Sequence, residues 1–461
     1  MARLGKIAAQ RFRIAMILCG AVAILFAFAR YGLAAGKSTP SKPETQKIEL
    51  FKDSAGVLAT YRPGYLIDRR NPFFDSHLGS NGRACATCHQ PRDGWAISVE
   101  HIRQRFRDSD GLDPLFRPID GAGCPSDDFS NMAARRKAYA LLLAKGLIRV
   151  SLAVPHNAEF KVIRIEDPYH CSTPTMLSVY RRPLPATNER FSSTVLSDGR
   201  FRSLKQQAID AALTHLQAKK APPAKQLGEI VAFEQGLYTA QITDKTAGPL
   251  DADGALGGPA ALAGQKFFRG INDPFGHNPT GAAPNVDIFF LFQSWDDLGG
   301  SAQARARAAI ARGQQIFDNR PMTMIGVAGL NDARGASSFT VTCGTCHDTP
   351  SVGNSSAGTL FNIGTSDSEQ STPDLPRFTL RCGDGTTVVT SDPGQAMVTG
   401  KCADIGKLKV PSLRGLAAHP PYFHNGTAAT LMDAVTFYDN RFIIGLSEQE
   451  KEDLVAFLNA L

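Results

Sequence analysis

Apolar side chains recur at helical spacing in several stretches of this 461-residue chain. The stretches with this spacing are 132–147, 204–218, 227–238 and the alanine-rich segment 303–317. The C-terminus shows it most clearly, because Ser447 and Glu450 form a capping-box pattern ahead of an apolar face. That face consists of Leu454, Val455, Phe457, Leu458 and Leu461. The pattern therefore predicts a helix in each of these stretches.

Strand patterns are few and short by comparison. Residues 244–285 are rich in Gly, Ala, Pro and Asp, and residues 349–408 in Gly, Ser, Thr and Asp, which is typical of loops. We therefore expect a mainly α fold with long loop insertions. A chain of this length exceeds what one core usually accommodates, so we expect two domains.

The first 35 residues have the features of an export signal. Basic residues precede an apolar run from Ile14 to Ala29, and small residues follow near Ala35. The run is short for a membrane span, which needs about 20 residues. We expect either cleavage near Ala35 or an uncleaved N-terminal anchor that would be the chain's sole membrane contact. Residues 36–48 have the composition of a linker, and we expect the remainder to be periplasmic.

The formal net charge of +7 comes largely from this N-terminal segment, which holds five basic residues and no acidic ones. The rest of the chain is therefore close to neutral. A balance of this kind gives no electrostatic footprint for nucleic acid. We expect no nucleic-acid partner.

Two stretches have the pattern Cys-x-x-Cys-His, which is the attachment signature of c-type haem. They comprise Cys85, Cys88 and His89, and Cys343, Cys346 and His347. In this chemistry the two thiols add to the haem vinyl groups and the imidazole binds the iron. A zinc half-site and a redox dithiol are the alternatives, but more than 250 residues separate the motifs. We expect two covalently bound haem c groups.

The remaining cysteines are Cys19, in the apolar N-terminal run, and four others further along the chain. An even number in an oxidising compartment predicts disulfides. We expect Cys124 to pair with Cys171, and Cys382 with Cys402. The alternative is that the four are unpaired core thiols.

The two motifs divide the chain into two cytochrome c-like helical haem domains. We expect an N-terminal haem domain over 49–243, a connecting loop over 244–285 and a C-terminal haem domain over 286–461.

The surroundings of the first motif, Asn71 to Gly82 before it and Gln90-Pro91 after it, resemble bacterial dihaem cytochrome c peroxidases and their MauG-type relatives. Further stretches that resemble this family are 173–177, 196–200, 409–414, 421–426 and 429–431. The segments 105–170 and 245–335 are insertions relative to the family's compact members. The haem motifs alone are generic, whereas the ordered set is specific.

The resemblance implies an exported dihaem oxidoreductase in which haem 1 reacts with peroxide or oxygen and haem 2 transfers electrons. The implied partners are a small redox protein or a quinol-linked electron partner, and peroxide, oxygen or an organic or protein substrate. The alternative is a dihaem electron carrier without catalytic activity.

For haem 2 the resemblance implies an axial pair of His347 and Tyr438, because the family's sixth ligand lies 14 residues after the position of His424. Alternatively, Tyr438 packs on the haem edge without binding the iron, or Met432 or His424 is the sixth ligand. His424 is expected to bond a propionate, and Arg200 and Arg414 to lie in the haem environment.

For haem 1 the family's distal Gln, Pro and Glu correspond to Gln207, Ala211 and Gln217. The acid–base carboxylate is therefore missing, and an amide cannot transfer a proton in its place. His215 is the candidate to take this role. Alternatively, His215 lies on an exposed face of the helix, or it is itself a sixth ligand that blocks the iron. His101 is another possible ligand of this iron.

The chain departs from the family in two further respects. The inter-haem tryptophan corresponds to Ser197, so Trp95 and Trp295 are left as relay or core residues. The calcium-binding Asn and Thr correspond to Ser172 and His419, which are poor calcium ligands. We expect calcium not to be held in the family's way.

Overall fold

The computed structural model describes residues 48–461, which belong to one compact unit. The predicted export signal or anchor over 1–35, and all but the last residue of the predicted linker over 36–48, lie outside the described residues. None of the helices over 48–461 is both long and apolar enough to cross a membrane.

The predicted helices are all present. The helices of the structure are α1 (Val99–Ser109), α2 (Met132–Ala138), α3 (Ala140–Lys145), α4 (Leu204–Thr214), α5 (Ala224–Gln235), α6 (Gly258–Ala263), α7 (Ala302–Asn319), α8 (Asn331–Arg334), α9 (Ala396–Thr399), α10 (Leu431–Phe442) and α11 (Glu448–Asn459). The stretch 132–147 is two helices because Tyr139, with φ −94° and ψ 21°, leaves the helical conformation between them. The capping box of α11 is confirmed, since Ser447 Oγ accepts from Glu450 N and Glu450 Oε2 from Ser447 N.

The expectation of few strands was wrong, and "mainly α" holds only in part. The strands over 48–461 are β1 (Glu49–Lys52), β2 (Gly56–Tyr61), β3 (Ile148–Ala153), β4 (Phe160–Glu166), β5 (Met176–Arg181), β6 (Tyr238–Asp244), β7 (Gly248–Pro249), β8 (Met322–Ile325), β9 (Ser338–Val341), β10 (Leu360–Phe361), β11 (Arg377–Cys382), β12 (Thr387–Thr390) and β13 (Leu408–Lys409). Helix accounts for 31% of the structure and strand for 17%. Strands this short have too few alternating positions to stand out from a loop.

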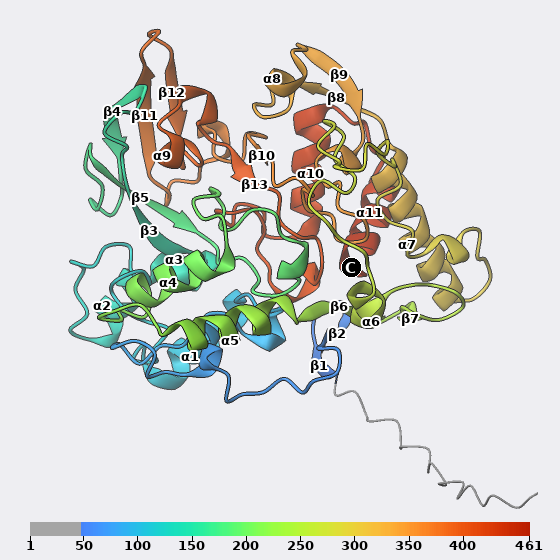
Figure 1. Ribbon diagram of the computed structural model, residues 1–461, viewed down its shortest axis with the longest axis horizontal. Coiled ribbons are helices and arrows are strands. Elements are labelled where there is room, and N and C mark those ends of the chain that lie inside the picture. The colour runs from blue at the N-terminus through green and yellow to red at the C-terminus, as the bar shows by residue number, and fades with distance from the viewer. Residues whose placement is uncertain (1–47) are drawn as a thin grey trace, which may run out of the picture. The chain divides into compact units, whose positions relative to one another are not determined.

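The two halves of the chain share a sheet. Strand β4 from the first half pairs antiparallel with β11 from the second, in a three-stranded sheet of order β12-β11-β4. Figure 1 shows this sheet at one side of the ribbon, with α7, α10 and α11 at the other. A second sheet, of order β1-β2-β6-β7, is built from the first half and the start of the connecting segment 244–285. The division into two haem domains stays a prediction.

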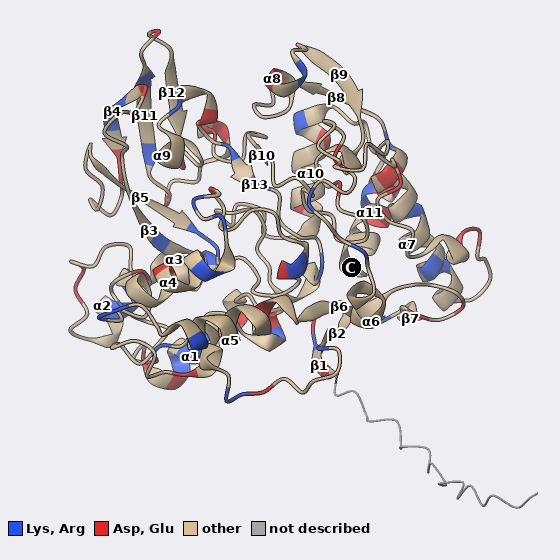
Figure 2. Ribbon diagram, viewed as in Figure 1, with Lys and Arg blue, Asp and Glu red and all other residues tan. Residues whose placement is uncertain are grey.

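Charged residues of both signs are interspersed over the elements (Figure 2). The ion pairs include deeply buried ones: Arg181 contacts both Asp198 and Asp392 at 2.6 Å.

Both predicted disulfides are present. Cys124 is bonded to Cys171 with an S–S distance of 2.08 Å, and Cys382 to Cys402 with one of 2.00 Å. The first ties the segment before α2 to the segment before β5. The second ties the end of β11 to the segment that follows α9.

The crossing of α7 and α11 forms the largest apolar core. The apolar face of α11, with Leu454, Phe457 and Leu458, packs in one buried cluster with residues of α7. The helices approach closely at Gly313 of α7, where an added Cβ would lie 2.0 Å from the carbonyl oxygen of Asp453. This position therefore excludes every side chain for lack of space.

We predict that Gly313→Ala destabilises the protein by about 1–3 kcal/mol, because the methyl group would force the two helices apart. The matched control is Gly228→Ala in α5, where an added Cβ meets nothing within 4 Å. That substitution should stabilise by about 0.5–1 kcal/mol through the lower entropy of the unfolded chain. Denaturant unfolding of the haem-loaded proteins measures both. Equal effects of the two substitutions would contradict the close approach of α7 and α11.

Candidate functional site

The two Cys-x-x-Cys-His motifs have the same local structure. Each begins with a 3-10 turn, over Cys85–Thr87 and over Cys343–Thr345. The threonine of each turn accepts a hydrogen bond from a backbone N–H three residues earlier, Ala84 N at 2.9 Å and Thr342 N at 3.4 Å. The four motif cysteines form no disulfide. The turn therefore holds two unpaired thiols and a histidine close together, as thioether attachment requires.

The ring of each motif histidine is oriented by a backbone carbonyl six residues further on. His89 Nδ1 lies 2.9 Å from the oxygen of Trp95, and His347 Nδ1 lies 2.6 Å from that of Gly353. Burial lowers the pKa of both histidines, which favours neutral rings. With Nδ1–H donating to the carbonyl, Nε2 keeps its lone pair for a metal ion.

The two residues whose carbonyls accept these hydrogen bonds have left-handed backbone conformations, with φ of 61° at Trp95 and 72° at Gly353. Glycine adopts this conformation without strain, whereas a tryptophan does so at a cost of about 1–3 kcal/mol. Trp95 is fully buried, and its Nε1 donates to Thr60 Oγ1 at 3.0 Å. Trp95 is thus a core residue whose backbone orients His89.

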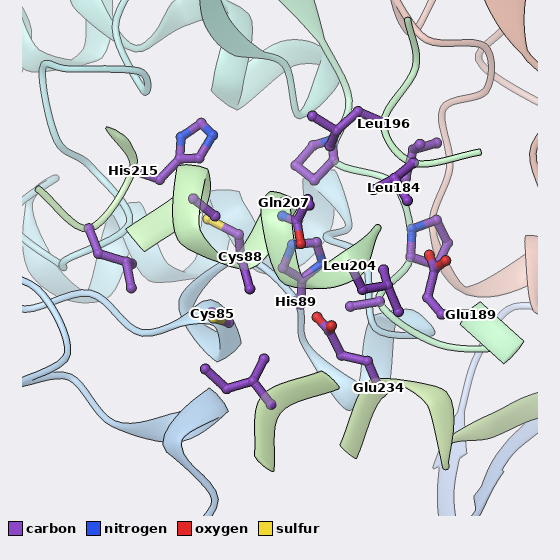
Figure 3. Close-up of a pocket in the computed structure, with 18 of the residues that line it drawn as sticks. Cys85, Cys88, His89, Leu184, Glu189, Leu196, Leu204, Gln207, His215 and Glu234 are labelled. Carbon is purple, nitrogen blue, oxygen red and sulfur yellow. The ribbon is translucent and has the colours of Figure 1, made fainter. Parts of the chain in front are cut away.

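A cavity surrounds the first motif, and Figure 3 shows its lining. Cys85, Cys88 and His89 line it together with Gln207, Ala211 and His215. The latter three are spaced by four residues, so α4 and its C-cap present them on one face. The structure thus brings two of the proposed distal residues, Gln207 and His215, to the first motif.

Gln217, the position of the missing carboxylate, does not line this cavity. Helix α4 ends at Thr214, before the predicted end at 218, and Gln217 has a left-handed φ of 52°. Its Oε1 accepts from Asn81 Nδ2 at 3.2 Å instead. The distal position that the resemblance implies for Gln217 requires α4 to continue through residue 217, which it does not.

His215 has a buried partner that the sequence did not indicate. Its Nδ1 lies 2.6 Å from Asp120 Oδ2, and Asp120 Oδ1 accepts from Arg83 Nη1 at 2.6 Å. Burial by itself raises the pKa of Asp120, but Arg83 and His215 outweigh it and lower the pKa below its ordinary value. The side chain of His215 is 37% exposed, so it is neither sealed in the core nor simply on the surface.

Glu234 of α5 is a second carboxyl group in the cavity that the sequence analysis missed. It is 6% exposed, and its Oε2 has no hydrogen-bond partner. Burial, followed by the nearby Glu189, raises its pKa to about 8. A signal was available: Glu234 follows Leu227 and Ile230 at the i, i+3, i+7 spacing of the apolar face, where a carboxyl group is out of place.

Tyr438 of α10 lies next to the second motif. It packs in one apolar cluster with Cys343 and Cys346. Burial, and then the two motif cysteines, raise its pKa. The fold thus brings Tyr438, one of the three proposed sixth ligands, to the second motif.

His424 and Arg200 have partners of their own. His424 is buried, with Nε2 at 3.2 Å from Ser366 Oγ and at 3.8 Å from Asp392 Oδ2. Arg200 Nε donates to Asp198 Oδ1 at 3.1 Å. Their expected roles beside a haem remain predictions.

Arg414 supplies an independent indication that an anionic group belongs near the second motif. Its Nε donates to Ser351 O at 2.6 Å, while both terminal nitrogens are buried without a partner. Burial lowers its pKa to about 9. A buried guanidinium with two open donors fits a carboxylate such as a haem propionate.

The other proposed residues do not line the described cavity. His101 Nδ1 pairs with the buried Asp93, and the backbone oxygen of Ser197 accepts from Lys409 N at 2.8 Å. Trp295 is buried and stacks on Phe292 with ring centroids 5.1 Å apart. Roles of Trp95 and Trp295 as electron relays stay predictions.

Ser172 and His419, the positions of the family's calcium ligands, have different surroundings. Ser172 Oγ accepts from Ser178 N at 3.1 Å. The Nε2 atom of His419 is buried without a partner, and burial lowers the pKa of this histidine to about 4. The expectation about calcium stays a prediction.

Known proteins match parts of this chain, although no family model does. The cytochrome c peroxidase IdrP1 of Denitromonas iodatirespirans is 43% identical over 89 residues, which are 17% of this chain and 24% of the relative. The cytochrome c peroxidase Ccp of Escherichia coli (strain K12) is 38% identical over 76 residues, 16% of each chain. The matches thus span a quarter or less of these relatives' length.

Among solved structures, a MauG-like protein associated with microbial copper homeostasis is similar with a TM-score of 0.41 and 14% identity, over 85% of this chain and 86% of that one.

We predict that Glu234→Gln stabilises the haem-loaded protein at high pH. A raised pKa means that the folded state binds more protons than the unfolded state between pH 4.5 and about 8. The stability contributed by Glu234 therefore falls as pH rises through this window, whereas glutamine does not titrate. The variant should gain up to a few kcal/mol over the wild type above pH 8, and less below pH 4.5.

Thermal unfolding midpoints at both ends of the window measure this difference. Glu229→Gln, at an exposed position of the same helix, is the control and should shift neither midpoint appreciably. A gain for Glu234→Gln that is the same at all pH values would show that Glu234 is not a buried carboxyl group.

Proposed function

We propose that this relative of the bacterial cytochrome c peroxidases is an exported dihaem oxidoreductase in which haem 1 reacts with peroxide and haem 2 transfers electrons. The observation that carries the proposal is the pairing, in one cavity, of a haem attachment motif with His215, a group that can accept and release protons. An electron carrier has no need of a group that transfers protons beside the iron.

The cofactor would supply iron that binds peroxide and passes electrons. The overall reaction consumes one hydrogen peroxide, two protons and two electrons and yields two waters, with the electrons drawn from a small redox protein. His215 would take a proton from one peroxide oxygen and return it to the other, which leaves as water when the O–O bond breaks. Gln207 can hydrogen-bond the peroxide but cannot transfer its proton.

For haem 2 we propose His347 and Tyr438 as the axial pair. The packing of Tyr438 against Cys343 and Cys346 supports this assignment, as does the carbonyl that orients His347. A phenolate donates strongly and stabilises ferric iron. Arg414 would bind a propionate through its two open donors.

For the chain as a whole we propose haem domains over 49–243 and 286–461, in the periplasm. Separate apolar clusters contact Cys85 of the first motif and Cys343 of the second, which supports one haem site in each half. The two disulfides suit an oxidising compartment.

An electron carrier is the second candidate, and one observation favours it. A histidine whose Nδ1 donates to a carboxylate is also the usual arrangement of a metal ligand. If His215 Nε2 bound the iron, haem 1 would have both axial positions filled and no room for peroxide.

Spectra of the purified ferric protein distinguish the two functions. We predict a high-spin component that shifts on addition of peroxide or cyanide, because an open axial position leaves the iron weakly liganded. An entirely low-spin protein that responds to neither in any redox state would establish the carrier instead.

We predict that Tyr438→Phe changes the absorption and resonance spectra of haem 2 and leaves those of haem 1 unaltered, since it removes the phenolate oxygen and retains the ring. Tyr422→Phe is the matched control, because Tyr422 is a largely buried tyrosine in the same half whose OH donates to the Leu416 carbonyl. Identical spectra for Tyr438→Phe and the wild type would remove Tyr438 as a ligand.

A further inference from the structure

Asp120 belongs to a part of the chain that the resemblance leaves unexplained. It lies between α1 and α2, within the insertion 105–170, and it is only 4% exposed. Its side chain lines the cavity of the first motif beside His215, from which it is 95 residues distant in sequence. The insertion therefore contributes a buried carboxylate to the haem 1 site.

Arg83 fixes the position of this carboxylate. It is 2% exposed, and its guanidinium donates to three oxygens of the insertion: Pro114 O at 2.8 Å, Leu115 O at 2.6 Å and Asp120 Oδ1 at 2.6 Å. It comes two residues before Cys85, so it anchors the insertion directly to the attachment motif. The backbone of Asp120 is held as well, because its oxygen accepts from Arg149 N at 2.7 Å.

The remaining oxygen of Asp120 is directed at His215. With Oδ1 occupied by Arg83, Oδ2 accepts from His215 Nδ1 at 2.6 Å. This bond selects the tautomer with the proton on Nδ1 and leaves the lone pair on Nε2. A carboxylate in this place also stabilises the positive charge that the imidazole acquires when Nε2 takes up a proton.

We propose that Asp120, held by Arg83, is a positioning residue that makes His215 the proton-transfer group of haem 1, in place of the carboxylate absent at Gln217. The inference rests on the proposed function. The proton taken from one peroxide oxygen resides on Nε2 and is then delivered to the leaving oxygen, so His215 ends the step unchanged. Asp120 stays ionised throughout and gains or loses no proton.

The chain offers a matched control for this arrangement. Asp273 is also buried, and its carboxylate also contacts a histidine, His277. Neither of the two lines the haem 1 cavity. Substitution of Asp273 therefore reports the general cost of removing a buried Asp–His pair in this molecule.

The experiment measures equilibrium binding of cyanide to the ferric, haem-loaded protein. Hydrogen cyanide binds as the anion and leaves its proton on a base in the pocket, so the affinity reports the proton acceptor apart from turnover. The variants are Asp120→Asn, His215→Gln, the double variant, and Asp273→Asn. Carbon monoxide binding to the ferrous protein, which transfers no proton, reports any general distortion of the pocket.

We expect Asp120→Asn to weaken cyanide binding by about tenfold or more, and to slow the reaction with hydrogen peroxide by about 10²-fold. In the His215→Gln background Asp120→Asn should add little, because the two residues act as one unit. Carbon monoxide binding should change less than twofold throughout, and Asp273→Asn should leave cyanide binding unchanged.

A second kinetic measurement separates proton transfer from structural damage. A peroxyacid releases a weakly basic carboxylate, which needs no proton from the protein in order to leave. Asp120→Asn should therefore slow the peroxyacid reaction far less than the hydrogen peroxide reaction, whereas a misshapen pocket would slow both alike.

Asp120→Asn leaves Arg83 buried without its partner, which destabilises the fold. If Asp120→Asn does not yield haem-loaded protein, the double variant Arg83→Gln/Asp120→Asn takes its place, because it removes both charges. We expect it to show the same weakened cyanide binding.

The outcomes separate the inference from the function on which it rests. A wild-type protein that binds neither cyanide nor peroxide overturns both. A wild-type protein that binds them, with unaltered affinity in Asp120→Asn, overturns the inference alone. Equal effects of Asp120→Asn in the presence and absence of His215 would also overturn it, since Asp120 would then act independently of His215.

Discussion

The imidazole of each attachment motif is held by one hydrogen bond to a carbonyl six residues further along the chain. Everything proposed for the irons depends on this bond, because it determines which ring nitrogen carries the proton and in which direction the other nitrogen points. The loop between His89 and Trp95, and that between His347 and Gly353, must therefore bring a carbonyl back under the ring. Both loops do so through a left-handed residue, although one uses glycine and the other a tryptophan clamped by Thr60.

The first haem cavity combines two carboxyl groups in opposite electrostatic situations. Asp120 is surrounded by Arg83 and His215, which lower its pKa and keep it ionised. Glu234 has no cation and no hydrogen-bond donor for one oxygen, so burial raises its pKa and favours the neutral acid. The two groups sit in one cavity with different charges at neutral pH, and only the ionised one contacts a base.

Local features of the sequence were reliable guides to local structure. Helical spacing located α4, α5, α7 and α11, and the Ser447–Glu450 box located the start of the last of these. The motif cysteines and both disulfide pairs followed from spacing and number. Gln207 and His215 line the cavity of the first motif because they lie on one face of a single helix and its cap, and their roles there stay predictions.

The features that the sequence analysis did not predict depend on contacts between distant parts of the chain. Gln217 was misplaced because α4 ends three residues before it and the backbone turns left-handed there. No sequence pattern indicated that Asp120 belongs to the site, because its hydrogen bond with His215 joins a loop to a helix end across 95 residues. The pairing of β4 with β11 is of the same kind, and neither strand is long enough to be recognised alone.

The shared sheet has a consequence for how the molecule behaves when its backbone is cleaved. A nick within 244–285 would separate the chain into two pieces, yet β4 would still pair with β11, and the oxygen of Leu461 would still accept from Gln241 N. Each disulfide lies within one piece, so the association would be entirely non-covalent. Such a clipped molecule would migrate as one particle in native conditions and as two bands in detergent without any reductant, and the pieces are candidates for complementation when mixed.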